Sequence, residues 1–424
     1  MLDIKLIRDD LAGVHASLNK RGSFEKSDLE KILLLDSDNR NLIKQLEEAQ
    51  AERNKFSKTK PSPENIAAAK SLGEKIKDLE TKSKNISTEL MERLADLPNL
   101  PAADVVAGGK ENNEVISTYG QVPKFDFVPK DHVELATSLG LIDYSRATKM
   151  SGSGFWCYTG LGALLEWALL SYFIDFHARN NYQFLIPPFL LSEKSAFNSG
   201  HLPKFRDDLF WTQDGLCLNA TSEMMLGNYH SGEILSESSL PLKYFAYSPC
   251  FRREAGSYRQ EERGMIRGHQ FNKVEMFIFS HPEKSWEMFA ELVGGATKLL
   301  TNLDLHFQVS KLAAGDCSAA MAKTYDLEVF IPSMNIYKEV SSVSNALDYQ
   351  ARRAQIRYKD KVADKNLFVH TLNASGLATS RLLPAILEQN QQADGSVIIP
   401  KVLRPFLPQS LKVIKADQKI VKKQ

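Results

Sequence analysis

The chain has 424 residues, of which 43% are hydrophobic and 25% are charged, and its formal net charge is +1. A chain of this length and ordinary composition is expected to fold into two or more globular domains. The balanced charge excludes a broadly basic coat for nucleic acid, so any nucleic-acid contact must be local.

The four cysteines, Cys157, Cys217, Cys250 and Cys317, are scattered and form no CxxC pair. This spacing predicts neither a disulfide framework nor a zinc ribbon, and it favours a reducing cytoplasm as the location of the protein. The first residues, MLDIKLIRDDL, carry too many charges for a signal peptide, and no apolar run reaches membrane-spanning length. We therefore expect no association with a membrane.

Two long helices are predicted near the N-terminus. Apolar residues recur alternately four and three positions apart from Ile32 to Phe56 and again from Ala69 to Leu90. The segment TKPSPEN separates the two runs, and LPNLP ends the second. We expect an antiparallel hairpin of two helices, each about 45 Å long. The alternative is a coiled coil between two copies of the chain, which we disfavour because the turn is short and both runs have similar lengths.

A linker is predicted after this helical arm. Residues 104–129 have mixed polarity and several glycines. They would join the arm, residues 1–103, to a larger domain, residues 130–424.

The larger domain is expected to mix helices with short strands. Helical spacing of apolar residues predicts a helix from Gly160 to Arg179, and YQFLIPPF predicts a short strand ended by Pro187 and Pro188, as at a sheet edge or a subunit interface. Further helices are predicted from Glu283 to Leu303 and from Leu382 to Gln392. This pattern favours an α+β fold with an antiparallel sheet.

A second hairpin, from Ser248 to Phe279, gathers polar chemistry on one face. Strand alternation places Arg252 and Glu254 on one face of its first strand. The loop AGSYRQEERGMI between the strands is longer than a structural hairpin needs, so we expect it to touch a ligand. One face of the return strand would carry Arg267, His269, Phe271, Lys273 and Glu275, and the other Val274, Met276 and Ile278.

Paired arginines, an aromatic ring and two carboxylates suit a nucleotide together with an amino acid. Arginine offers a planar fork to phosphate oxygens, and an aromatic ring can stack on a base. The alternative is a solvated hairpin with cross-strand Arg–Glu pairs, which would be the better interpretation if this segment stood alone.

Three further clusters share this chemistry. LNATSEMML is predicted to place Thr221 and Glu223 on one strand face, and each cluster alone would be an ordinary polar surface. The chain contains no Walker loop, Rossmann glycine fingerprint or HExxH motif. The other two clusters are YKEVSSVSN, with Glu339, Ser341 and Ser342, and TLNASGLATSR, with Asn373, Ser375 and Arg381 at the start of a helix.

In combination, these segments resemble the bacterial type of seryl-tRNA synthetase, a family of class II aminoacyl-tRNA synthetases. The match covers nearly the whole chain, including FRREAGSYRQEERGMIRGHQFNKVE, KTYDLEVFIP and EVSSVSNALDYQARR. The resemblance implies an N-terminal antiparallel helical hairpin (a coiled-coil arm) that binds tRNA, a class II catalytic domain with an antiparallel sheet, and a homodimer. It implies that L-serine, ATP and Mg²⁺ give seryl adenylate and that serine then passes to the 3′ end of tRNA(Ser). It leaves open whether tRNA(Sec) is also charged.

The matched positions imply residue roles. Arg252 would hold the α-phosphate, Arg267 the tail of ATP, and Arg381 would enclose the adenine with Phe271 and reach the outer phosphates; these three arginines are the expected catalytic residues. Glu254 would read the adenine amine. The implied ATP-binding set is Arg252, Arg253, Glu254, Arg267, Phe271, Glu339, Val340, Ser341, Ser342 and Arg381.

The implied serine pocket includes Glu275, which would accept a hydrogen bond from the substrate hydroxyl. Glu339 and Ser342 match the family's magnesium positions, and because they are three residues apart we expect a bend in that strand. The full serine-binding set is Thr221, Ser222, Glu223, Arg252, Glu275 and Ser375.

The chain departs from the family pattern beside these residues. Ala220, Ser222, Ala374 and Gly154 stand where the family usually has proline, alanine, glycine and arginine. Two other classes of function remain as hypotheses: a paralogue that binds RNA or a carrier protein without charging tRNA, and a coiled-coil scaffold. A coiled-coil scaffold would leave the residues expected to bind phosphate and serine without a role.

Overall fold

The computed structural model describes residues 1–56, 62–255 and 264–416 of the chain. It consists of two compact units, Met1–Leu100 and Pro101–Gln424. Within the described residues, no helix combines the length and the apolar character that crossing a membrane requires.

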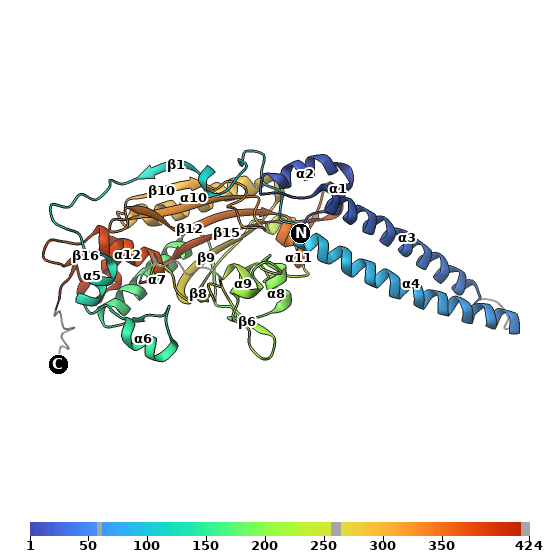
Figure 1. Cartoon of the computed structure of the whole chain (residues 1–424), viewed down its shortest axis with the longest axis horizontal. Coiled ribbons are helices and arrows are strands. Elements are labelled where there is room, and N and C mark those ends of the chain that lie inside the picture. Colours follow the sequence, from blue (N-terminus) through green and yellow to red (C-terminus); the bar gives the residue numbers. More distant parts are fainter. Residues whose placement is uncertain (57–61, 256–263, 417–424) are drawn as a thin grey trace. The chain divides into compact units, whose positions relative to one another are not determined.

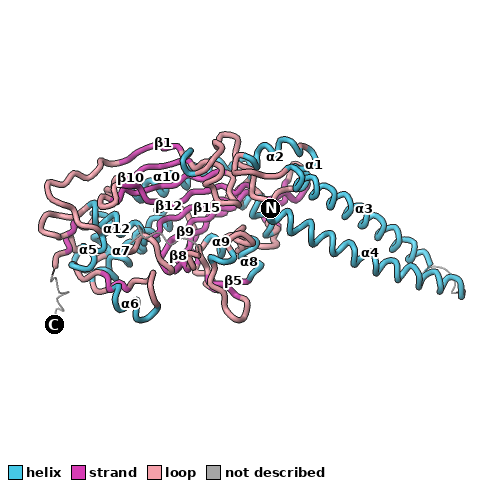
Figure 2. Tube along the Cα trace, viewed as in Figure 1, coloured by secondary structure: helices cyan, strands magenta, loops and turns pink. Residues whose placement is uncertain are grey.

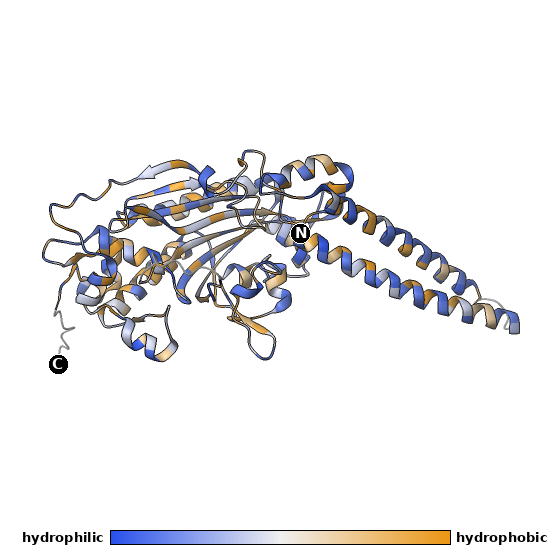
Figure 3. Ribbon diagram, in the orientation of Figure 1, coloured by the Kyte–Doolittle hydropathy of each residue, from blue (hydrophilic) through white to orange (hydrophobic). Residues whose placement is uncertain are grey.

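The N-terminal unit is built on a hairpin of two long helices, α3 (Lys26–Phe56) and α4 (Pro63–Asp96) (Figure 1). With 31 and 34 residues, the helices are each roughly 45–50 Å long. Hydrophilic residues dominate both helices, and hydrophobic ones recur at intervals (Figure 3). The predicted hairpin within one chain is confirmed. Its buried seam joins Leu42, Leu46 and Ala49 of α3 to Ile76 and Leu79 of α4.

Local caps define where α4 begins. The Ser62 side chain accepts a hydrogen bond from the backbone N–H of Asn65 at 3.1 Å, and Pro63 occupies the first turn, where its missing N–H costs nothing. The helix therefore starts inside the predicted breaker TKPSPEN. Residues 57–61 of the turn lie outside the described part of the chain.

Two short helices, α1 (Ile4–Asp9) and α2 (Leu11–Asn19), pack against α3. Ile7 and Leu18 are fully buried there. Arg8 forms an ion pair of 2.6 Å with Asp36, which is itself almost fully buried. The base of the hairpin is thus held by a small core of its own.

The second unit is built on an eight-stranded sheet of order β1-β10-β11-β12-β15-β9-β8-β4 (Figure 2). Neighbouring strands are antiparallel except β4 and β8, which run parallel. The α+β prediction with an antiparallel sheet is confirmed. The strands are β1 (Glu114–Tyr119), β4 (Gln183–Leu185), β8 (Leu242–Phe251), β9 (Gln270–Ser280), β10 (Phe307–Lys311), β11 (Lys323–Ile331), β12 (Ile336–Leu347) and β15 (His370–Ala378).

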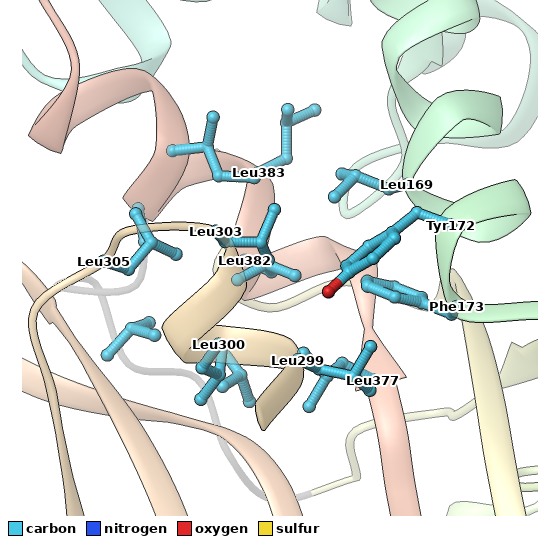
Figure 4. Packing of buried hydrophobic residues seen from close by; sticks show 14 of the residues in the cluster. Leu169, Tyr172, Phe173, Leu299, Leu300, Leu303, Leu305, Leu377, Leu382 and Leu383 are labelled. Atoms are coloured by element: carbon cyan, nitrogen blue, oxygen red, sulfur yellow. The ribbon is translucent and has the colours of Figure 1, made fainter. Parts of the chain in front are cut away.

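Three helices, α7 (Leu161–Arg179), α10 (Ser285–Asn302) and α12 (Thr379–Gln389), cover one face of this sheet. They match the predicted helices, but α12 begins at Thr379, so that Arg381 lies in its first turn. Figure 4 shows Leu169, Tyr172 and Phe173 of α7 beside Leu299 and Leu300 of α10, Leu303 directly after α10, and Leu382 and Leu383 of α12.

The smaller elements surround the sheet. They include a three-stranded sheet of order β14-β13-β7, in which β7 is parallel to β13. They are α5 (His132–Ser138), β2 (Ile142–Asp143), α6 (Tyr144–Ser151), β3 (Cys157–Tyr158), β5 (Leu190–Ser192), α8 (Glu193–Asn198), β6 (Leu216–Leu218), α9 (Glu223–Leu226), β7 (Ile234–Ser236), α11 (Tyr349–Ala354), β13 (Arg357–Asp360), β14 (Lys365–Phe368), β16 (Val397–Ile398) and β17 (Val413–Ile414).

The segment predicted as a linker, 104–129, is partly built into the sheet. β1 lies within it and pairs with β10 as the edge strand. Its side chains are mostly exposed, so its sequence lacks the alternation that marks a half-buried strand. The compact units also divide at Leu100 and Pro101, slightly before the predicted boundary.

The short strand that ends in prolines is an edge strand, as predicted. β4 is the last strand of the sheet, beside β8. Phe184 and Ile186 are exposed at this edge, as is Trp167 on α7. This part of the second unit therefore presents several large apolar side chains to solvent.

Candidate active site

A cavity of about 480 Å³ lies on the face of the sheet opposite α7, α10 and α12. Along β9, β12 and β15, alternate residues point into the cavity and into the core. Val274, Met276 and Val343 belong to the core. The residues that point the other way into the cavity are Lys273, Glu275, Ser342, Ser344, Asn373 and Ser375.

The hairpin of β8 and β9 confirms the predicted pairing, but not the predicted strand geometry at its end. β8 ends at Phe251, so Arg252 and Glu254 are not alternating strand residues. The backbone turns away there, and Glu254 adopts a left-handed φ of 52°. Both side chains still line the cavity, together with Arg267. The loop residues 256–263, for which we predicted a ligand contact, lie outside the described residues.

His269 of the same motif makes contacts within the protein. Its Nδ1 lies 3.0 Å from the carbonyl oxygen of Arg252, and its ring packs near Phe155 and Phe210. Gly154 lies beside it with a φ of +80°, and a Cβ there would be 2.6 Å from the His269 ring. The arginine that the family usually carries at this position would require His269 to move.

Three arginines line the cavity, and each has a partner in or beside it. The Arg252 guanidinium lies 5.1 Å from the centre of the Phe271 ring. Arg267 donates from Nε to Glu254 at 2.7 Å, and Arg381 donates from Nη1 to the Glu339 carboxylate at 3.2 Å. Each cation is thus held near a group that a nucleotide could replace as its partner.

Arg381 is also fixed by the backbone. Its Nη1 donates to the carbonyl oxygen of Glu339 at 2.9 Å, and its Nε donates to that of Ile266 at 3.2 Å. A smaller recess beside the main cavity is lined by Phe271, Val340 and Arg381 among others. The ring and the guanidinium therefore flank one space.

The bend predicted between Glu339 and Ser342 is present. Leu327 of β11 pairs with Ser341, but the next residue, Glu328, pairs with Glu339, so the pairing skips Val340. This β-bulge allows Glu339 and Ser342 both to line the cavity despite their odd spacing.

Asp326 of β11 pairs with Ser342 and is nearly buried. Burial and the neighbouring Glu339 carboxylate raise its pKa well above the ordinary value, although a hydrogen bond from Ser342 opposes this. Its Oδ1 has no hydrogen-bond partner among the described residues. No pattern in the sequence indicates a role for Asp326, because an acidic residue between Tyr325 and Leu327 resembles an exposed strand position.

One part of the cavity wall is a buried polar network around Lys273. Lys273 donates from Nζ to Thr221 Oγ1 at 2.7 Å and forms an ion pair with Glu275 at 2.8 Å. Asn373 donates from Nδ2 to Glu275 at 3.1 Å and to Glu223 at 3.3 Å. A lysine and two carboxylates are thus held together out of contact with bulk water.

Thr221 and Glu223 belong to this network, but the predicted strand there is wrong. Glu223 is the first residue of helix α9, and Thr221 precedes it. Apolar residues crowd this segment, and its helix is too short for periodicity to reveal it. Gln350 of α11 donates to Glu223 at 2.6 Å, a contact that no sequence pattern indicated.

Burial changes the acid–base properties of this part of the cavity. Burial, and then the nearby Glu275 carboxylate, raise the pKa of Glu223 to about 7, while Gln350, Lys273 and Arg252 oppose that rise. His201 also lines the cavity, and burial followed by the charges of Arg252 and Lys273 lowers its pKa to about 3. His201 is therefore neutral at ordinary pH.

Several predicted site residues lie beside the cavity and do not line its main chamber. Ser222 is buried with its Oγ 2.7 Å from that of Ser248, and Ser341 donates to the carbonyl oxygen of Ser375 at 2.6 Å. Arg253 has an exposed side chain, and its backbone N–H donates to Asp208. Conversely, Lys273 was predicted to lie on one face of the return strand, but not to line the site as a buried charge.

Two family models match the chain. Residues 1–101 match the seryl-tRNA synthetase N-terminal domain, and residues 205–390 match the tRNA synthetase class II core domain (G, H, P, S and T). The curated serine–tRNA ligase 2 of Clostridium acetobutylicum is 50% identical over 96% of this chain and 99% of its own length. The serine–tRNA ligase of Geobacter sulfurreducens is 43% identical over 96% of this chain and 98% of its own.

Solved structures agree with these matches. The seryl-tRNA synthetase from Pyrococcus horikoshii, complexed with ATP, superposes with a TM-score of 0.91 at 34% identity, over 99% of this chain and 100% of that one. The cytoplasmic serine–tRNA ligase of Naegleria fowleri, in complex with AMP, gives a TM-score of 0.87 at 30% identity, over 99% of both chains.

Proposed function

The chain belongs to the seryl-tRNA synthetase family of class II aminoacyl-tRNA synthetases, and from this premise we propose how its residues perform the reaction. Its activity is that of an ATP-dependent serine–tRNA ligase, which joins L-serine to ATP as seryl adenylate and transfers serine to the 3′ end of tRNA(Ser). The observation that carries the residue assignment is one cavity lined by three arginines, a buried lysine and two buried glutamates.

ATP would bind beside the three arginines. Phe271 and Arg381 flank the recess proposed for the adenine, and Glu254 would accept from the exocyclic amine once it leaves Arg267. Arg252 would hold the α-phosphate and Arg267 the tail. This exchange of partners replaces ion pairs within the cavity by ion pairs to phosphate, which limits the cost of desolvating the arginines. Arg253, Val340 and Ser341 complete the proposed ATP-binding set as neighbours of these residues.

Catalysis would consist of alignment and charge stabilisation. A serine carboxylate oxygen attacks the α-phosphorus, the bond to the β-phosphate oxygen breaks, and pyrophosphate leaves. No side chain has to form a covalent intermediate. Arg252 would stabilise the charge that develops at the α-phosphate, while Arg267 and Arg381 would stabilise the leaving group.

Serine would bind at the buried polar network around Lys273. Glu223 and Thr221 would receive its ammonium group, and Glu275 would accept a hydrogen bond from its hydroxyl. Ser375 donates to Glu275 at 3.3 Å, and so helps to orient the carboxylate. Ser222 would act from behind the pocket, through its contact with Ser248.

The residues at the bulge fit a magnesium ion. Glu339 and Ser342 supply a carboxylate and a hydroxyl oxygen on one wall, and the unpartnered oxygen of Asp326 lies close to them. Mg²⁺ prefers such oxygen ligands and usually takes few from protein and the others from substrate phosphates and water. The ion would neutralise phosphate charge when bound; Glu339 and Ser342 would hold it.

We assign the N-terminal arm, within residues 1–103, to tRNA binding, residues 104–129 to the connection, and residues 130–424 to the catalytic domain. An exposed helical hairpin roughly 45–50 Å long can follow the backbone of a protruding RNA stem, since RNA helices are recognised largely through shape and phosphates. Binding of tRNA(Sec) would use the same surface if that RNA carries a similar stem.

A second copy of the chain would cover the exposed edge at β4. Phe184, Ile186 and Trp167 there form an apolar surface that a homodimer would bury. We also propose a cytoplasmic location, since the four cysteines are free and the substrates are those of translation.

Serine-dependent exchange of pyrophosphate into ATP tests the assignment without RNA. We expect exchange with L-serine, weaker exchange with alanine, and charging when tRNA(Ser) is added. Exchange that does not depend on serine would contradict the proposal for the pocket. Charging absent despite normal exchange would favour the paralogue that binds RNA or a carrier protein without charging tRNA.

A further inference from the structure

A carboxylate buried behind the cavity joins three elements of the catalytic unit. Glu166 belongs to α7 and is only 2% exposed. Its neighbours Leu165, Ala168 and Leu169 are part of the apolar core. An ionisable group in such surroundings costs several kcal/mol unless hydrogen bonds compensate it.

One oxygen of this carboxylate serves two partners. Glu166 Oε1 accepts a hydrogen bond from Asn272 Nδ2 at 2.8 Å and another from Thr379 Oγ1 at 2.6 Å. Asn272 lies on β9 and Thr379 is the first residue of α12. Glu166 thus links a strand and a helix at a point where Thr379 Oγ1 also donates to the carbonyl oxygen of Asn272 at 3.1 Å and Ala378 pairs with Lys273, so its carboxylate adds a third connection between the two segments.

The two partners are close in sequence to the groups that flank the ATP recess. Asn272 directly follows Phe271, and because strand residues alternate, Phe271 faces the cavity while Asn272 faces the core. Thr379 stands two residues before Arg381 in the first turn of α12. A shift of either segment would change the gap between the Phe271 ring and the Arg381 guanidinium.

The other carboxylate oxygen, Oε2, accepts no hydrogen bond of normal geometry from a described residue. Burial raises the pKa of Glu166 to about 7, against the opposing effects of Thr379, Asn272 and Tyr158. The titratable groups that face it are Tyr158 of β3 and Tyr247 of β8, whose own pKa values are raised. Burying a carboxylate with only one hydrogen-bonded oxygen is unfavourable, and an apolar side chain would fill the core at lower cost. We infer that the hydrogen bonds accepted by Oε1 have a function.

We propose that Glu166 is a positioning residue for ATP, which fixes the separation of Phe271 and Arg381 by holding Asn272 and Thr379 on a single carboxylate oxygen. This inference rests on the proposed function, in which Phe271 and Arg381 enclose the adenine. The residue acts through its neighbours and touches no substrate.

The test compares two substitutions in serine-dependent pyrophosphate exchange. Glu166→Ala removes the accepting oxygen and should raise the KM for ATP about tenfold while leaving the KM for serine within about twofold. Glu166→Gln keeps an accepting oxygen of the same reach, so it should restore the KM for ATP to within about threefold of the wild-type value. A glutamine variant as impaired as the alanine variant, or an equal rise in both KM values, would overturn the proposal.

A matched control separates positioning from stability. Glu388 is a fully buried carboxylate at the other end of α12, where it accepts hydrogen bonds from His132 and Ser333. Glu388→Gln should lower the Tm without separating the two KM values. If Glu166→Ala does not fold, Thr379→Val removes the donor to Glu166, together with the 3.1 Å contact of the same hydroxyl with the Asn272 carbonyl oxygen, and preserves the shape of the side chain. It should still raise the KM for ATP several-fold, and no change in that folded variant would overturn the proposal.

Phe271→Ala, measured in parallel, shows which inference has failed. An unchanged KM for ATP in Phe271→Ala would contradict the adenine site itself. A raised KM in Phe271→Ala together with normal values in Glu166→Ala and Thr379→Val would overturn only the role of Glu166.

Discussion

The arm and the cavity use charged side chains in opposite ways. On the arm, pairs such as Lys82–Asp78 and Arg93–Glu89 lie four residues apart and are largely exposed. Pairs of this kind contribute about 0.3–0.5 kcal/mol each and are screened by salt. In the cavity, Lys273 and Glu275 are 7% and 1% exposed, and each has further partners.

This difference predicts how each region tolerates change. An arm whose charges are solvated should accept single substitutions with small effects, because water replaces each lost partner. A buried network should not accept single substitutions with small effects, since removal of one charge leaves another unpaired. Effects on serine activation should therefore arise from the cavity, and effects of the arm should be confined to the RNA step.

The largest effect is expected at Arg252. Arg252→Ala should lower the turnover of pyrophosphate exchange by at least about a hundredfold, because an electrostatic contact to the reacting phosphate is lost. The Tm should change little, since the side chain lines a cavity and not the core. The control is Arg93→Ala on α4, which should leave exchange unchanged. Near-normal exchange by folded Arg252→Ala would sink the assignment.

Shortening the arm should separate the two half-reactions. Replacing residues 43–82 by a short glycine-rich turn removes the distal hairpin but keeps the Arg8–Asp36 pair and the contacts of α1 with α3. Exchange should stay within a few-fold of normal, while kcat/KM for tRNA(Ser) should fall roughly 30-fold or more and RNA binding should depend less on salt. Normal charging by this variant would show that the arm is structural.

A smaller effect is expected for serine specificity. Glu275→Gln keeps the size of the side chain but weakens the acceptor proposed for the substrate hydroxyl. The ratio of kcat/KM for serine over alanine should fall roughly tenfold, because a site that reads a hydroxyl rejects analogues without it. Asn373→Ala serves for comparison, since it removes a partner of Glu275 without removing the carboxylate. A constant ratio in Glu275→Gln would assign the hydroxyl to another residue.

The smallest effect concerns pH. The pKa of Glu223 is raised to about 7, mainly by burial and by Glu275. The ammonium group of serine favours the ionised carboxylate, so serine should bind more tightly as pH rises through 7, with release of a proton. The KM for serine should fall up to about tenfold between pH 6 and pH 8. Glu223→Gln should raise the KM and flatten this profile, and a persistent slope would point to another group.

The same contrast explains what the sequence could predict. The arm follows from periodicity, because Ile76 and Leu79 face Ala49 only if both helices keep a regular repeat. The β8–β9 hairpin and the core face with Val274 follow from alternation in the same way. These features depend on interactions between residues that are close together in the sequence.

The remaining features depend on contacts between distant segments. Gln350 reaches Glu223 across more than a hundred residues, and Thr379 meets Glu166 from a different helix. Arg252 and Glu254 were assigned to a strand because alternation does not reveal where β8 stops. The roles of such residues came from family resemblance, and no rule of periodicity would have found Lys273 as a buried pocket charge.

The bulge in β12 changes which side chains of this strand point to each face of the sheet. Without it, a strand that turned Ser342 and Ser344 toward the cavity would turn Glu339 toward Val343 and the core, where a carboxylate has no partner. One additional residue, at Val340, lets a carboxylate and two hydroxyls that are separated by an odd number share one wall. Inserting one residue beside Val340 would leave every side chain of the motif present and yet turn Glu339 to the opposite side of the sheet from Ser342. The site is therefore encoded in the count of residues along this strand as much as in their identity.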